Sequence, residues 1–573
     1  MSMIAPNARQ LIASARGLSA ALDFACVSHG RAAALLIVFC LIAFLPGFFQ
    51  IPPVDRDEAR FAQATKQMVE SGDYVDIRFQ DEVRYKKPVG IYWLQATAVE
   101  AGRALGVSHA DTTIWLYRLP SLAGATSAVL LTYWAALAFV GRRAALLSAL
   151  MMASAVVLGV EGRLAKTDAV LLACSVAAMG ALARIYLVQR RTPQAAADWK
   201  QPAILWTAIA IGILIKGPMV PMFVALAVIT LSILDRSARW LEALRPLSGF
   251  IWLLLIVLPW FTAIALRSGD NFFEQAVGHD MLGKVAGGQE SHGAPPGYYL
   301  LLYWVTFWPG SVLTGLAAPA AWRARREAAT QFLFAWLIPS WLVFEAVPTK
   351  LPHYVMPLYP AIAILVAGVM ESGNLVTARW LTRGTAGWFL FPGLLAIAVP
   401  VMFIVVGNDL GLIVWPFAAA AVIFGLFAWW LYEADGAERS LLRGVVASVF
   451  VAITAYALTF PRLPALFPSA MVAADLRASG CASPQLASTG AYQEPSLVFL
   501  AGTDTRFTDG AGAAEFLNRG ACRFALIDAR SERSFVQHAD ALGLRYALAA
   551  RIDGYNISIG KPVALKMFRS MAP

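Results

Sequence analysis

Residues 55–93 form a polar stretch that directly follows the first long apolar run of the chain. Charged side chains beside a bilayer are costly to keep, so this stretch is better explained by a function than by packing. A carboxylate in such a place can act as a general base, or can stabilise positive charge on a sugar carbon in an oxocarbenium-like transition state. A lysine can neutralise a phosphate. The stretch contains two charged clusters. The first is Asp57, Glu58 and Arg60, and the second is Lys86 and Lys87, which lie between Tyr85 and Pro88.

Both clusters also have a structural interpretation. In a helix expected from about Asp57 to Glu70, Arg60 lies three positions after Asp57, on the same face and within reach of its carboxylate. An amphipathic helix at a membrane surface has the same pattern without any catalytic role. Lys87 and Tyr85 could likewise be lysine and aromatic side chains at the membrane–water interface. The residues themselves leave both interpretations open.

Three other polar connections carry further charged residues. The connection 161–168 is a turn between two apolar runs, which needs so many charges only if they form salt bridges. The connection 348–354 contains two prolines, which make a rigid, non-helical approach to the next apolar run. In 267–297, His279 and His292 lack the spacing of a metal site, so no metal ligand is assigned and a divalent cation stays open as a cofactor. The candidate residues in these connections are Arg163 and Asp168, His279 and Lys284, and Lys350 and Tyr354.

The composition predicts a polytopic α-helical membrane protein. Of the 573 residues, 59% are hydrophobic and only 14% are charged, which is far too apolar for a soluble protein of this length. The net charge of +10 does not indicate nucleic-acid binding, because the basic residues lie in short clusters between apolar runs, where they orient helices in a membrane. About thirteen runs are long enough to span or nearly span a bilayer. They are 33–49, 119–140, 143–160, 167–188, 203–216, 218–235, 246–266, 298–319, 329–346, 354–371, 386–407, 411–433 and 440–460.

The distribution of Lys and Arg predicts the orientation of these spans. Alternate connections are basic and are expected on the side of the N-terminus, which is the cytoplasmic side. Residues 50–118, 161–168, 267–297 and 348–354 then lie on the outer side, together with the C-terminus. Their basic residues do not follow the orienting rule, so binding of an anion such as a phosphate is the simplest explanation for them.

Residues 462–573 are less apolar and are expected to form a small α/β domain outside the membrane. Short β-rich runs occur at 496–501, 523–529 and 546–552, with helical patterns between them. Cys481 and Cys522 lie in this region and could form a disulfide in an oxidising compartment.

Taken in order, these motifs resemble the lipid-dependent GT-C glycosyltransferases. The resemblance is closest to the bacterial aminoarabinose transferase family, which is related to the protein O-mannosyltransferases. One position departs from the family pattern, because Lys86 stands where the family often has Glu before Lys-Pro, which weakens any metal site that uses this acid. The motifs that carry the resemblance are Asp57-Glu58-Ala59-Arg60-Phe61, Ser71-Gly72-Asp73, Lys87-Pro88 with Tyr92-Trp93, Arg163 with Asp168, Lys216-Gly217, the loop 279–299, and Lys350-Leu351-Pro352-His353-Tyr354.

The resemblance implies a GT-C fold, with periplasmic juxtamembrane helices, a catalytic membrane domain at 1–461 and a periplasmic domain at 462–573. It implies a monomer in the bacterial inner membrane that transfers a sugar from a polyprenyl (undecaprenyl) phosphate to a lipid A-like acceptor at the periplasmic face. The implied catalytic residues are Asp57 and Asp168. The implied donor-binding residues are Tyr85, Lys87, Lys284, Lys350 and Tyr354, with Glu58, Arg60, Arg163 and His279 in support.

Two other functions fit the same pattern. A protein or polysaccharide glycosyltransferase would share the fold and the donor, and would differ in its acceptor. A transporter or flippase for a lipid-linked sugar would also need many spans and basic residues. A transporter, however, should carry charges near the middle of the bilayer and on both faces, whereas here the unexplained charges gather on one face.

Overall fold

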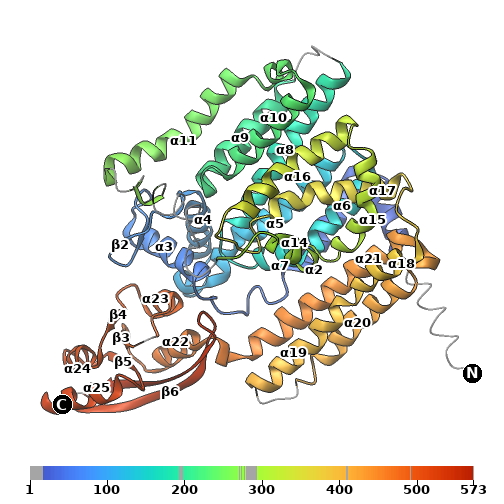
Figure 1. Cartoon of the computed structure of the whole chain (residues 1–573). Coiled ribbons are helices and arrows are strands. Elements are labelled where there is room, and N and C mark those ends of the chain that lie inside the picture. The colour runs from blue at the N-terminus through green and yellow to red at the C-terminus, as the bar shows by residue number, and fades with distance from the viewer. Residues whose placement is uncertain are drawn as a thin grey trace, which may run out of the picture.

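The computed structural model describes residues 17–571 except for 193–197, 270–271, 273, 277, 279–292, 408–410 and 491. Figure 1 shows a large bundle of helices with a smaller unit of strands and helices attached near one end. The bundle helices are α2 (His29–Phe44), α5 (Ile114–Ala136), α6 (Arg142–Ser154), α7 (Val156–Glu161), α8 (Asp168–Arg191), α9 (Lys200–Lys216), α10 (Met219–Asp235), α11 (Pro246–Ser268), α14 (Tyr298–Thr306), α15 (Ser311–Arg323), α16 (Ala328–Ala346), α17 (Tyr359–Glu371), α18 (Arg379–Ala386), α19 (Phe391–Gly407), α20 (Trp415–Trp430) and α21 (Tyr432–Ala452).

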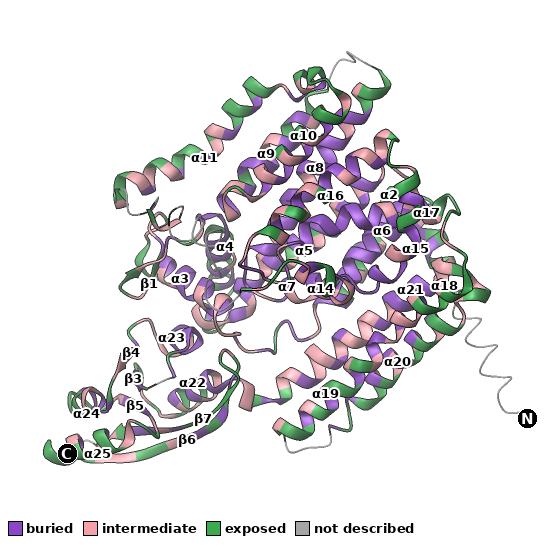
Figure 2. Cartoon of the chain, in the orientation of Figure 1, coloured by how far each residue is buried: buried purple, intermediate pink, exposed green. Residues whose placement is uncertain are grey.

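The bundle is organised around α8. Of the most apolar part of this helix, 83% is buried inside the protein, and α5, α9 and α10 pack against it. Figure 2 shows the same arrangement, with buried residues concentrated in the centre and exposed residues along α11, α19 and α20. The exposed residues of these outer helices are largely hydrophobic, as expected for a surface in contact with lipid.

Long apolar helices confirm a multi-pass helical membrane protein. In the described part of the chain, six helices are long and apolar enough to cross a membrane, or seven if the bent pair α14 and α15 forms one span. The predicted number of thirteen is not confirmed. The predicted span 143–160 is divided between α6 and α7, and the predicted span 298–319 is bent by 120° between α14 and α15, where Pro309 cannot continue a regular helix.

Two helices connected by a short hairpin follow α2. They are α3 (Asp57–Ser71) and α4 (Gly90–Ala104), with the antiparallel strands β1 (Arg78–Phe79) and β2 (Glu82–Val83) between them. Asp57 and Glu58 lie in the first turn of α3, where their negative charges interact favourably with the helix dipole and stabilise the helix. The helix ends at Gly72, whose φ of 70° is the left-handed conformation that glycine adopts most easily. The sequence therefore fixes both ends of the helix that carries the first charged cluster.

The C-terminal unit, defined here as residues 468–571, contains one mixed sheet. The strand order is β4-β3-β5-β7-β6, with β3 parallel to both β4 and β5, and β7 antiparallel to both β5 and β6. A disulfide joins Cys481 to Cys522. The elements are α22 (Pro468–Ala478), β3 (Gln485–Thr489), α23 (Pro495–Ala501), β4 (Arg506–Thr508), α24 (Gly510–Asn518), β5 (Arg523–Asp528), α25 (Glu532–Ala541), β6 (Tyr546–Asn556) and β7 (Lys561–Ser570).

The strands predicted at 523–529 and 546–552 are found as β5 and β6. The strand predicted at 496–501 is wrong, because these residues lie in the helix α23. Pro495 occupies the first turn of this helix, where its missing N–H costs nothing, and the apolar residues pack against α22 and α3 instead of a neighbouring strand. Packing between elements therefore decided the structure of this short apolar run.

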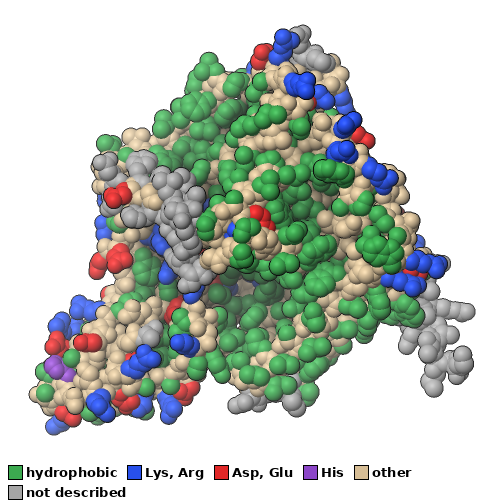
Figure 3. Space-filling view, in the orientation of Figure 1, with side chains coloured by type: hydrophobic (Ala, Val, Ile, Leu, Met, Phe, Trp, Pro, Cys, Tyr) green, Lys and Arg blue, Asp and Glu red, His purple; other side chains and the backbone are tan. Residues whose placement is uncertain are grey.

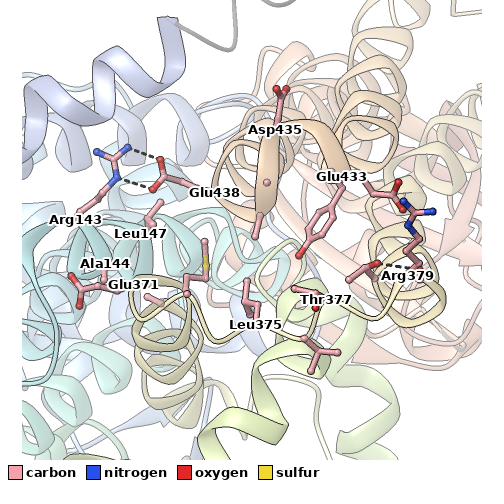
Figure 4. Close-up of a pocket in the computed structure, with 18 residues that line it drawn as sticks. Arg143, Ala144, Leu147, Glu371, Leu375, Thr377, Arg379, Glu433, Asp435 and Glu438 are labelled. Carbon is pink, nitrogen blue, oxygen red and sulfur yellow. Dashed lines mark hydrogen bonds and ion pairs between the residues drawn. The ribbon is translucent and has the colours of Figure 1, made fainter.

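The two ends of the bundle are both polar. In Figure 3, hydrophobic side chains cover most of the visible surface of the bundle, and Lys and Arg gather along the edge that is farthest from the C-terminal unit. A cavity of about 750 Å³ lies at this far end between α6, α17 and α21 (Figure 4). In it, Arg143 forms two hydrogen bonds with Glu438, of 2.7 and 2.5 Å. Arg143 and Arg379 line this same cavity, and both belong to the basic connections that the sequence predicts on the side of the N-terminus.

Candidate active site

A cavity of about 320 Å³ lies where the beginning of α3 meets the beginning of α8 and the end of α9. The connections 162–167 and 347–355 complete its walls. Segments that are far apart in the sequence therefore bring their charged residues to one place. The polar side chains that line it include Asp57, Arg60, Arg84, Lys86, Lys87, Lys166, Asp168, Lys216, His353 and Tyr354.

Asp57 and Glu58 are neighbours in the sequence but have different surroundings. Asp57 is half-buried and lines the cavity, and no described residue forms a hydrogen bond or ion pair with its carboxylate. Glu58 is only 2% exposed and accepts hydrogen bonds from Arg118 at 2.8 and 2.9 Å. Backbone N–H groups of Val54 and Ala165 donate to the same carboxylate at 2.8 and 2.9 Å. Glu58 is thus committed to structure, whereas Asp57 is available to a substrate.

Asp168 lies in a network of charged residues on the opposite wall. Its carboxylate is 2.5 Å from Lys216 Nζ and 3.8 Å from Lys166 Nζ, and its Oδ1 is 3.5 Å from His353 Nε2. Glu161 closes the network at 3.3 Å from Lys166 Nζ and 3.2 Å from His353 Nδ1. Glu161, Lys166, Asp168 and His353 are buried and Lys216 is largely so, and the network therefore holds its ammonium groups in fixed positions beside the cavity.

Burial and neighbouring charges set the protonation states of this network. Burial lowers the pKa of His353 to about 3, so its imidazole is neutral near pH 7. Burial also acts to lower the pKa of Lys166, but Glu161 and Asp168 outweigh this effect and raise the pKa above its usual value. Lys166 is therefore positively charged. Burial raises the pKa of Glu161, and the nearby Lys166 only partly opposes this.

The network does not fit a divalent cation. Glu161, Asp168 and His353 present ligand atoms within 4.8 Å of one another, which is the spacing of a small metal site. The ammonium groups of Lys166 and Lys216, however, already neutralise the two carboxylates. A cation would have to displace both lysines, so no catalytic step is assigned to a metal here.

Lys216 also contacts Tyr354, which is one of the predicted donor-binding residues. Its Nζ lies 5.1 Å from the centre of the Tyr354 ring, which is within the range of a cation–π interaction. Asp168, Lys216 and Tyr354 thus form a chain of contacts from the beginning of α8 to the cavity. Lys87 lines the cavity as well, and its Nζ donates to the Lys86 carbonyl at 2.9 Å.

Three predicted site residues lie outside this cavity. The Tyr85 hydroxyl donates to Asp76 at 2.7 Å, in a separate hollow. Arg163 donates to the Pro46 carbonyl at 2.9 Å, close to the end of α2. The Lys350 ammonium donates to backbone carbonyls at the end of α16, including that of Glu345 at 2.8 Å. The predicted His279 and Lys284 lie outside the described residues.

The candidate residues chosen from the sequence did not include Arg84, which lines the cavity. Its guanidinium lies 5.4 Å from the centre of the Phe61 ring, and its buried Nε has no hydrogen-bond partner among the described residues. Arg60 lines the cavity too but forms no ion pair with Asp57. Proximity of Arg84 to Lys86 and Lys87 was the available signal, since all three lie in the second cluster or directly before it.

The fold and the site define the structural class. The structure of ArnT from Cupriavidus metallidurans bound to undecaprenyl phosphate matches this chain with a TM-score of 0.70 and 18% identity, over 93% of this chain and 97% of that one. A likeness at this level shows the GT-C fold. The family model of dolichyl-phosphate-mannose-protein mannosyltransferases matches residues 34–269, which include α3, α8 and α9.

Relatives in sequence give a more particular match. The chain is 28% identical over 330 residues to an undecaprenyl phosphate-alpha-4-amino-4-deoxy-L-arabinose arabinosyl transferase of Erwinia tasmaniensis, covering 56% of each chain. It is 26% identical over 403 residues to the protein of the same name from Yersinia pestis, covering 66% of each. The matches thus span less than two thirds of these relatives. They confirm the resemblance to the aminoarabinose transferases that the motifs predicted.

Proposed function

We propose that this protein is a membrane glycosyltransferase that moves a sugar from a polyprenyl phosphate to an acceptor at the outer face of the bacterial inner membrane. The observation that carries this proposal is the Asp57 carboxylate, which is unpaired among the described residues and faces a cavity rich in Lys and Arg. A sugar phosphate needs both features, because positive charge develops on the sugar carbon while negative charge develops on the phosphate.

The reaction breaks the bond between the sugar carbon and the donor phosphate oxygen and forms a bond to an acceptor oxygen. The departing phosphate becomes a dianion, so cations beside it stabilise the transition state more than the ground state. Lys87, Arg60 and Arg84 are the proposed cations. If the acceptor is a hydroxyl, Asp57 takes its proton as the new bond forms. If the acceptor is an ionised phosphate, no base is needed and Asp57 instead supports positive charge on the sugar.

Asp168 has a positioning role in this proposal. Its carboxylate is bound to Lys216 at 2.5 Å and to Lys166 at 3.8 Å, so it is already neutralised and is a poor base. By holding Lys216 against Tyr354, it keeps a cation and a hydroxyl at the edge of the cavity. The resemblance implied a catalytic role for both carboxylates. In this proposal Asp57 acts on the substrate, and Asp168 positions the residues around it.

Two observations support an outer, periplasmic location for the site and the C-terminal unit. The Cys481–Cys522 disulfide is typical of an oxidising compartment such as the periplasm. The basic residues Arg143 and Arg379, which are expected on the cytoplasmic side, line a cavity at the other end of the bundle. The domains proposed on this basis are 1–461 within the membrane and 462–573 outside it.

The resemblance supports undecaprenyl phosphate as the carrier and a lipid A-like molecule as the acceptor. A protein or polysaccharide acceptor remains the alternative within the same class. Transport of the lipid-linked sugar is less well supported, because α8 has no charged residue between Asp168 and Arg184 and is buried over most of its length. A polar headgroup would find no charged side chain along this central helix between the two polar ends.

Vesicles that contain the purified protein provide the test. Undecaprenyl phosphate carrying 4-amino-4-deoxy-L-arabinose and lipid A would be incubated with them, and mass spectrometry would measure free undecaprenyl phosphate and modified lipid A. The proposal predicts that both products appear together. The assay would be repeated with a protein and a polysaccharide acceptor. Movement of the donor across the bilayer, with no release of undecaprenyl phosphate in the presence of any of these acceptors, would instead establish a transporter.

A further inference from the structure

The C-terminal unit contacts the middle and the end of α3. Near the end of α3, Lys66 Nζ donates to the Phe499 carbonyl at 3.1 Å, and Glu70 accepts a hydrogen bond of 2.8 Å from Thr503. In the middle, Gln63 donates to the Thr503 hydroxyl at 2.9 Å. The unit thus lies against the helix that begins with Asp57, as Figure 1 shows for α23 and α3.

The two residues directly before Asp57 are each bound to the C-terminal unit. The Ser496 N–H donates to Asp55 Oδ1 at 3.0 Å, and Arg56 Nη2 donates to the Ser558 carbonyl at 2.6 Å. Arg56 has a φ of 66° and a ψ of −111°, a backbone conformation that residues with a side chain rarely adopt. Such a conformation persists only when surrounding contacts hold it. Its guanidinium has one such contact, to the C-terminal unit.

The partner groups in the C-terminal unit are themselves held by a buried carboxylate. Glu494 accepts hydrogen bonds from Asn556 Nδ2 at 2.6 Å and from the Ser558 hydroxyl at 3.1 Å. Glu494 and Asn556 are 8% and 3% exposed. Glu494 thereby connects the turn between β6 and β7, which presents the Ser558 carbonyl, to the beginning of α23, which presents the Ser496 N–H.

We infer that the C-terminal unit sets the position of Asp57, with Asp55 and Arg56 as positioning residues that transmit its docking to the catalytic carboxylate. The inference rests on the proposed function, because it assumes that Asp57 acts in the reaction. The Asp57 carboxylate forms no hydrogen bond or ion pair with any described residue, so its place in the cavity depends on the backbone before it and on the start of α3. The C-terminal unit holds the backbone before Asp57 through Asp55 and Arg56, whereas the start of α3 is held by Glu58 and its bonds to Arg118.

The protonation of Asp55 supports this inference. Burial, and then the neighbouring Glu494, raise the pKa of Asp55 to about 7, while its bonds to Ser496 act in the opposite direction. Glu58 adds a smaller effect of the same sign as Glu494, and the Arg56 guanidinium is bonded to Ser558. Because the folded pKa lies above the usual value of 3.8, docking is strongest at acidic pH and weakens as the pH rises from about 4 through about 7.

Hydrogen exchange and kinetics together test the inference on the full-length protein. In Arg56→Ala, the amides of residues 57–60 should exchange at least tenfold faster, kcat should fall at least tenfold, and the donor KM should change less than twofold. Glu494→Gln should likewise speed the exchange of these amides and lower kcat. Arg56→Lys keeps a hydrogen-bond donor on a shorter side chain. It should therefore restore part of the protection from exchange and part of kcat.

Two controls separate the possible outcomes. Arg551→Ala removes an exposed ion pair with Asp553 on β6 and should change neither exchange at 57–60 nor kcat. Asp55→Asn, which cannot ionise, should make the protection factors at 57–60, in which the intrinsic pH dependence of amide exchange is corrected for, independent of pH between 5 and 8. Unchanged exchange and kcat in both Arg56→Ala and Glu494→Gln would overturn the inference. A rise in donor KM with unchanged exchange would also overturn it, since Arg56 would then bind the substrate directly.

The same experiments distinguish this inference from the proposed function. If Asp57→Asn abolishes transfer while Arg56→Ala and Arg56→Lys behave as the unaltered protein, only the positioning role fails. If Asp57→Asn transfers sugar normally, the catalytic role of Asp57 fails and this inference fails with it. If the unaltered protein transfers no sugar, the proposed function fails, whatever the exchange data show.

Discussion

Arg118 and Glu58 form a buried ion pair with two hydrogen bonds, of 2.8 and 2.9 Å, directly beneath the candidate active site. The remaining donors of Arg118 reach the backbone carbonyls of Phe48, Ile51 and Pro52, so this one guanidinium organises the chain just before α3. The pair turns Glu58 into the protein and leaves Asp57 at the cavity. A single buried contact therefore gives two adjacent carboxylates different surroundings.

Removing one partner of this pair should destabilise the protein. We expect Arg118→Ala to lower the free energy of unfolding by about 3–5 kcal/mol, because it leaves a buried carboxylate without its partner. Thermal unfolding in detergent would measure the loss. The double variant Arg118→Met with Glu58→Leu should recover much of the stability, since no charge is then left unpaired. Equal loss in the single and double variants would contradict this explanation.

Lys87 and Lys350 should respond differently to substitution. We expect Lys87→Met to weaken binding of undecaprenyl phosphate about tenfold, which is about 1.4 kcal/mol, because Lys87 lines the cavity. Lys350→Met should leave that affinity within about twofold and should lower thermal stability, because its ammonium satisfies carbonyl groups at the end of α16. A binding assay with the labelled lipid and an unfolding scan would separate the two. The reverse pattern would assign the donor phosphate to Lys350.

Chelation of divalent cations should leave transfer unchanged. The carboxylates of Glu161 and Asp168 are neutralised by Lys166 and Lys216, so the cavity has its positive charge without a metal ion. Initial rates measured with and without EDTA should agree within about twofold. A loss of activity that added Mg²⁺ or Mn²⁺ restores would show that a cation is required.

The ends of α3 could be predicted because local signals fix them. A helix from Asp57 to about Glu70 was expected, and α3 runs from Asp57 to Ser71. The grouping of the candidate residues was predicted in part, since Asp57, Lys87, Asp168 and Tyr354 line the candidate active-site cavity together. These residues share the end of the bundle that the alternation of basic connections assigned to them.

The direction of individual side chains could not be predicted. Tyr85 and Lys87 are two positions apart, yet one contacts Asp76 in a separate hollow and the other lines the cavity. Nothing in the sequence pairs Glu58 with Arg118, which lies 60 positions later, directly before an apolar run. The contacts of Asp55 and Arg56 with Ser496 and Ser558 span more than 400 residues. Such long-range contacts depend on the assembled fold.

The transfer rate of Asp57→Asn tests the central claim most directly. The change keeps the size of the side chain and removes its negative charge, and the purified variant would be assayed with the lipid-linked sugar and the acceptor. We expect kcat to fall at least a hundredfold, in line with the usual contribution of a general base, while the melting temperature and the affinity for undecaprenyl phosphate stay close to those of the unaltered protein. Glu58→Gln, which alters the neighbouring buried carboxylate, should mainly reduce stability. Transfer by Asp57→Asn at a rate near that of the unaltered protein would contradict the account.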